Sequence, residues 1–139
     1  IVRTATVLSQ EGANLFRKFD LTEAQFNVLF SLKYKERKWT QSDLGRRLVV
    51  TRASVTSVLD KLEEKGLVRR GAVSNNRRIY HVEITEKGLE ILDEVEPRYR
   101  QNIHRVLASF STEECRQLIG YLERVREQVY EVSEPEARE

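Results

Sequence analysis

The stretch TQSDLGRRLVVTRASVTSVLDKLEEKGLVRRGAVSNNRRIYHVEIT, residues 40–85, carries the signals of two short helices followed by a two-stranded hairpin. Thr40 is a favourable N-cap residue, and Asp43 in the first turn suits the positive end of a helix. Thr51 is placed to cap a second helix, and Gly66 is a natural residue to end it. Two helices at this spacing are typical of a helix–turn–helix motif.

The hairpin is expected directly afterwards, with strands at residues 67–73 and 79–85 and residues 74–78 between them. Apolar and polar residues alternate from Tyr80 to Ile84, which is the pattern of a half-buried strand. The adjacent asparagines of the connection tolerate left-handed turn geometry. These strands would form a small antiparallel sheet beside the two helices.

Helices are expected on both sides of this centre. Thr22 and Gln25 have the spacing of a capping box, as do Ser111 and Glu114, so a helix should follow each pair. Pro97 lies inside the helix expected before Ser111 and should bend it. The flanking helices are expected at residues 2–18, from 22 into the segment 33–38, at 86–109 and from 112 onward. The sequence therefore predicts a mostly α fold with a small two- to three-stranded antiparallel sheet.

Composition limits the classes of protein that this chain can be. Its 139 residues carry a net charge of only +2, so DNA binding would depend on where charge lies rather than on its total. A single cysteine, Cys115, and the lack of a membrane-length apolar run or a signal-peptide pattern predict a cytoplasmic protein. Because His81, His104 and Cys115 lack ligand spacing and no catalytic motif occurs, we expect no metal, no cofactor and no enzyme.

The helix expected at residues 51–66 has two different faces. Val55 and Leu59 fall on a core-facing side, whereas Ala53, Ser54 and Ser57 fall on the opposite side near the N-terminus. Small uncharged side chains allow close approach to base edges, and hydroxyls can donate or accept there. This face fits a recognition helix in a major groove, although the same residues also fit an ordinary exposed helix surface.

Four arginines favour the DNA interpretation. Arg69 and Arg70 lie in the first strand, and Arg77 and Arg78 lie at the tip of the hairpin. They predict a local positive patch in a nearly neutral protein, and arginine is favoured in narrow minor grooves. A solvated charged face is the usual explanation for such a run, but its place beside a helix–turn–helix favours DNA.

The chain resembles the MarR family of winged helix–turn–helix transcription regulators along nearly its whole length. The resemblance lies in LTEAQFNVL (21–29), TQSDLGRRLVVTRASVTSVLDKLEEKGLVRR (40–70), NRR (76–78), VEITEKG (82–88) and STEE (111–114). It implies one domain over residues 1–139, in which residues 22–85 form the DNA-binding part. Residues 1–20 and 86–139 would then supply helices that join two copies into a homodimer. Such a dimer would bind a pseudo-palindromic operator on double-stranded DNA, with the wing, residues 74–78, at the minor groove.

The resemblance also assigns roles to particular positions. The base-reading positions of the family fall on Ala53, Ser54 and Ser57, and its minor-groove arginine falls on Arg78. The family's acidic wing residue is replaced here by Asn76, which weakens the expected ordering of the wing arginines. The full set of expected DNA-binding residues is Thr40, Gln41, Thr51, Arg52, Ala53, Ser54, Thr56, Ser57, Lys61, Arg69, Arg77 and Arg78.

Regulators of this kind are often repressors released by a small aromatic ligand, and the resemblance implies the same here. Tyr34, Trp39, Tyr99 and His104 could line such a site, although aromatic residues at these positions are more often core. Cys115 lies beside two glutamates, which favours a structural thiol over a redox sensor. The alternative functions are a winged-helix protein–protein adaptor and a thiol redox sensor that uses Cys115.

Overall fold

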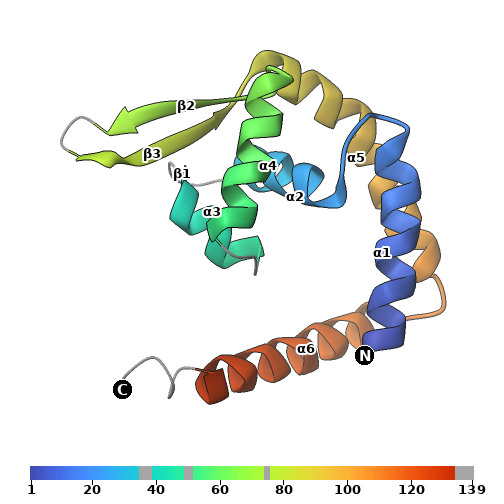
Figure 1. Ribbon diagram of the computed structural model, residues 1–139. Coiled ribbons are helices and arrows are strands. Elements are labelled where there is room, and N and C mark those ends of the chain that lie inside the picture. Colours follow the sequence, from blue (N-terminus) through green and yellow to red (C-terminus); the bar gives the residue numbers. More distant parts are fainter. Residues whose placement is uncertain (35–38, 49–51, 74–75, 134–139) are drawn as a thin grey trace. The chain divides into compact units, whose positions relative to one another are not determined.

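The computed structural model describes residues 1–34, 39–48, 52–73 and 76–133 (Figure 1). Helical and extended segments follow one another in the order expected from the sequence. The elements are α1 (Val2–Arg17), α2 (Glu23–Lys33), β1 (Trp39–Thr40), α3 (Gln41–Leu48), α4 (Arg52–Glu64), β2 (Val68–Val73), β3 (Asn76–Ile84), α5 (Glu86–Val106) and α6 (Thr112–Ser133). The prediction of a mostly α fold with a small antiparallel sheet is confirmed.

The sheet has three antiparallel strands in the order β1-β3-β2. The strand β1 pairs with the middle of β3, where Trp39 lies opposite Val82. One boundary prediction was wrong: β3 begins at Asn76 rather than at residue 79, because Val73 already pairs with Asn76. Residues 76–78 therefore lie in a strand, since a connection of two residues is enough to join antiparallel strands.

The core lies where α2, α3, α4 and the sheet meet. It contains fully buried leucines and valines from each of these elements, together with Leu92 and Val95 of α5. Val55, Leu59 and Leu62 are at most 1% exposed, so the predicted inner face of the 51–66 helix is confirmed. The backbone at Gly66 has φ 71°, a conformation that glycine adopts without strain, and this confirms the predicted helix stop.

Aromatic rings join α1, α2 and α5. The rings of Phe16 and Phe26 stack with centroids 4.3 Å apart, and Tyr99 lies 4.8 Å from Phe26. Below them, Lys33 donates to Asp93 over 2.6 Å and to the buried carboxylate of Glu96 over 2.8 Å. These contacts hold α1 and α5 against α2.

The chain divides into two compact units, Ile1–Tyr99 and Arg100–Glu139. The helix α5 ends at Val106, three residues before the predicted end, where the Ala108 N–H donates to the carbonyl of Arg105, only three residues back. A reciprocal capping box between Ser111 and Glu114 then starts α6, as predicted.

Candidate nucleic-acid interface

The first helix of the motif begins with a reciprocal cap. The Thr40 hydroxyl accepts from the Asp43 N–H over 3.2 Å, while Asp43 Oδ2 accepts from both the N–H and the hydroxyl of Thr40. Thr40 also belongs to β1, so the same residue starts α3 and attaches it to the sheet. The prediction that Thr40 caps this helix is confirmed, and Asp43 does more than interact with the helix dipole.

A side-chain hydrogen bond joins the two helices of the motif. Gln41 Nε2, in the first turn of α3, donates to Thr56 Oγ1 of α4 over 2.5 Å. Beneath it, Leu44 and Val55 pack in the core. Both Gln41 and Thr56 were predicted to contact DNA, and their mutual hydrogen bond gives them a structural role in joining α3 to α4.

The outer face of α4 displays small and basic side chains. Ser54, Ser57 and Lys61 are exposed, and they follow one another at spacings of three and four residues. Thr51 lies outside the described residues, as do the side chains of Arg52, Ala53, Arg77 and Arg78. The described part of the predicted face is thus accessible to a large partner.

Two of the four hairpin arginines form ion pairs within the chain, so they add less to a positive patch than the sequence predicted. Arg69 lies opposite Glu83 across the β2–β3 ladder and donates to it through Nε and Nη2, over 3.0 and 2.9 Å. Arg70 binds the carboxylates of Asp60 and Glu63 on α4. Arg69 remains exposed, but its charge is partly compensated by the ion pair with Glu83.

The segment TEKG, residues 85–88, explains how α4 is attached to α5. Thr85 donates its hydroxyl to the Gly66 carbonyl over 2.7 Å, and Lys87 donates to the Lys65 carbonyl over 2.8 Å. These two bonds satisfy carbonyls that the end of a helix leaves free. Gly88 lies so close to Leu67 that a Cβ would stand 2.2 Å from its carbonyl oxygen. Sequence reasoning found the motif but not these contacts.

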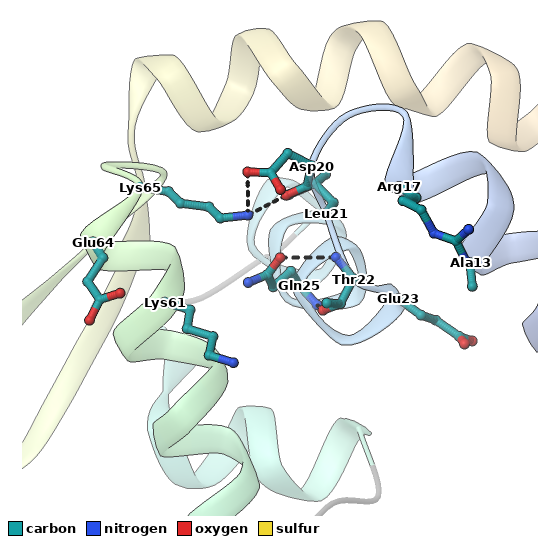
Figure 2. A pocket seen from close by; sticks show the side chains of 10 residues that line it. All are labelled: Ala13, Arg17, Asp20, Leu21, Thr22, Glu23, Gln25, Lys61, Glu64 and Lys65. Carbon is teal, nitrogen blue, oxygen red and sulfur yellow. Dashed lines mark hydrogen bonds and ion pairs between the residues drawn. The ribbon is translucent and has the colours of Figure 1, made fainter.

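An open groove of about 630 Å³ lies between the end of α1, the start of α2 and the last turns of α4 (Figure 2). Lys65 crosses it and donates to Asp20 Oδ2 over 2.9 Å. Arg17 and Lys61 also line the groove, and within the described residues neither has a carboxylate partner. The groove therefore presents these two basic groups together with the carboxylates of Glu23 and Glu64, and it lies against the helix expected to read DNA.

The aromatic residues considered for a ligand site serve mainly in the core. Tyr99 packs among phenylalanines, Trp39 is partly buried against the core, and Tyr34 donates to the buried Glu96. His104 is exposed on α5. The interpretation as core is confirmed for Trp39 and Tyr99, whereas Tyr34 is 52% exposed.

Some classes of site are missing from the described part of the chain. Among those residues, no group of three histidine, cysteine or acidic side chains is placed to hold a metal ion. None of the helices described combines the length and apolarity needed to cross a bilayer.

A helix–turn–helix with an exposed, small-residue second helix and an adjoining hairpin defines a winged-helix DNA-binding protein. Residues 21–80 match the model of the MarR family. The chain is 33% identical over 108 residues to the HTH-type transcriptional regulator MhqR of Bacillus subtilis, covering 78% of this chain and 74% of that protein. It is 35% identical over 99 residues to the transcriptional repressor MprA of Escherichia coli, covering 70% of this chain but 56% of that protein.

Solved structures of MarR family regulators have the same fold as this chain. AbsC, a MarR family transcriptional regulator from Streptomyces coelicolor, shares the fold with a TM-score of 0.85 at 22% identity, over 93% of this chain and 88% of that chain. The transcriptional regulator MOSR of M. tuberculosis, solved in complex with DNA, has a TM-score of 0.75 at 30% identity, over 91% of this chain and 92% of that chain. The chain belongs to the MarR family, and it is a DNA-binding transcriptional regulator.

Proposed function

We propose that this chain is a repressor that binds a pseudo-palindromic operator as a homodimer and is released by a small ligand. The recognition helix α4 enters the major groove, and the end of the hairpin reaches the minor groove. The observation that carries this proposal is the exposure of Ser54, Ser57 and Lys61 on the face of α4 opposite its fully buried residues. We further propose that the protein works in the cytoplasm and has no catalytic activity.

The exposed apolar face of α6 supports the homodimer. Leu118, Leu122, Val125 and Val129 are 39–56% exposed and recur at steps of four, three and four residues. This spacing forms a seam that another helix can cover. Val7 and Leu8 of α1 are exposed as well, at 53% and 45%. A second copy would bury these residues and hold two copies of α4 about one helical turn of DNA apart, roughly 34–36 Å.

A charge substitution at the hairpin tests the mode of DNA binding. Arg78→Ala should weaken operator binding and lower the slope of log affinity against log salt by about one, because one phosphate-proximal cation is lost. Lys18→Ala, which removes one charge at the end of α1, is the control and should leave that slope unchanged. If both variants bind as wild type does at every salt concentration, the hairpin does not contact DNA.

The groove of Figure 2 is our candidate for the ligand site. Arg17 could bind the carboxylate of an aromatic acid, with Lys61 on the α4 side of the groove, and occupation of the groove would press on the last turns of α4. Salicylate should raise the melting temperature of the protein and weaken its DNA binding. Both effects should be lost in Arg17→Ala and kept in Lys18→Ala, and an unchanged response of Arg17→Ala would exclude this groove.

A further inference from the structure

Successive residues of a strand point to opposite faces of the sheet, so the neighbouring residues Arg69 and Arg70 of β2 face opposite ways. Val68 and Val82 are buried, and Arg70 lies opposite Val82, so Arg70 shares the face of the sheet that packs against the body of the protein. Arg69 lies on the other face, opposite Glu83. The side chains are 22% and 74% exposed respectively, which agrees with this difference.

Arg70 makes a multiple contact with α4. Its Nη2 donates to Asp60 Oδ1 and to Glu63 Oε2, both over 2.6 Å, and its Nε donates to Glu63 Oε2 over 2.9 Å. The backbone N–H of Arg70 donates to Glu63 Oε1 over 3.0 Å. Glu63 therefore binds both the side chain and the main chain of one strand residue, so sliding or rotation of β2 would break several bonds at once.

The two carboxylates belong to the helix that carries the proposed DNA-reading face. Asp60 and Glu63 lie three residues apart on α4, and Ser57 lies three residues before Asp60. Hydrogen bonds from the Arg70 side chain, followed by that from its N–H, hold the pKa of Glu63 below its ordinary value. The carboxylate is thus charged, and it remains a strong acceptor across the neutral range.

We propose that Arg70, Glu63 and Asp60 form a positioning bracket, which fixes the angle between α4 and the β2–β3 hairpin so that both can reach DNA together. The role of the bracket in DNA binding rests on the proposed function. Its members are positioning residues, because their charges are satisfied by one another rather than offered to phosphate.

The bracket and simple electrostatics predict opposite results for one substitution. Glu63→Gln removes a negative charge from a DNA-binding surface, so electrostatics alone would strengthen binding to a promoter-region duplex. Loss of the bracket should instead weaken the binding of this duplex about tenfold. Glu64→Gln, at the next position of α4, is the matched control and should not weaken binding. Arg70→Lys keeps the charge but lacks the planar fork, so it should weaken binding by a similar factor.

Further measurements separate positioning from folding and from the proposed function. The double variant Arg70→Lys with Glu63→Gln should lose no more DNA affinity than the weaker-binding single variant, because the two substitutions remove the same contact. Circular dichroism should show the helical content unchanged. Hydroxyl-radical protection by the hairpin in the minor groove should fade, while guanine N7 protection by α4 in the major groove persists.

A distance measurement without DNA completes the test. Spin labels at Ser57→Cys and Gly71→Cys, in a Cys115→Ser background, should give a narrow distance distribution that broadens on adding Arg70→Lys or Glu63→Gln. An unbroadened distribution, or a Glu63→Gln variant that binds DNA as tightly as its parent, overturns the bracket. If the distribution broadens but the parent protein binds no specific duplex, the bracket stands as a structural device and the proposed function fails.

Discussion

Gln41 and Thr56 connect the two helices of the motif through a side-chain hydrogen bond of 2.5 Å. The bond lies beside the exposed face of α4 and links it to the first turn of α3. Thr56→Val removes the acceptor at constant shape and should lower the free energy of unfolding by about 1 kcal/mol. Thr56→Ser keeps a hydroxyl and should lose less. Urea denaturation of both variants measures this difference, and equal losses would contradict a role for the bond.

A second prediction concerns the polar contact between α2 and α5. The Glu96 side chain is only 7% exposed and accepts from Lys33 over 2.8 Å. Hydrogen bonds from Lys33 to Asp93, then to Glu96, raise the pKa of Lys33, so the ion pair persists through the physiological range. Lys33→Met would leave a buried carboxylate without its main counter-charge, and it should cost about 2 kcal/mol of stability. The exposed Lys18→Met should change the stability little in the same denaturation series.

Two glycines in helices should respond oppositely to alanine. At Gly88 a Cβ would meet the Leu67 carbonyl oxygen at 2.2 Å and Ile84 Cγ1 at 2.8 Å, so Gly88→Ala should destabilise by about 3 kcal/mol. At Gly120 nothing lies within 4 Å. Because alanine is the better helix former, Gly120→Ala should stabilise α6 by about 0.5–1 kcal/mol. Thermal melts of both variants measure these changes in stability, and a tolerated Gly88→Ala would show that α5 does not approach Leu67 and Ile84 so closely.

The contact of Glu63 with Arg70 also predicts a pH dependence. The folded protein holds the pKa of Glu63 below its ordinary value of 4.5, so the stabilisation is fully present above that pH. It is lost as the pH falls through the lower folded value. The stability difference between wild type and Glu63→Gln should therefore be constant near neutrality and narrow below pH 4.5. A difference that stays the same down to acid pH would mean that the carboxylate charge is not what stabilises the contact.

Local signals in the sequence predicted most of the fold. The capping boxes at Thr22 and Ser111 and the stop at Gly66 depend on residues a few positions apart, and all three were confirmed. The contact of Arg70 with α4 could not be predicted from such local signals. The spacing of Arg70 to Asp60 and Glu63 is short, yet their contact depends on which face of β2 turns toward α4. A charge run alone could not show that one arginine binds inward and its neighbour does not.

A polarisation titration measures the sequence-specific binding of this protein to its operator. Wild-type protein is titrated against a duplex from the promoter region of its own operon and against a scrambled duplex, over a series of salt concentrations. We expect selective binding of the first duplex, with two subunits per site and an affinity that falls steeply as salt rises. Equal, weak binding of both duplexes at every salt concentration would rule out sequence-specific operator binding and favour a winged-helix adaptor that binds another protein.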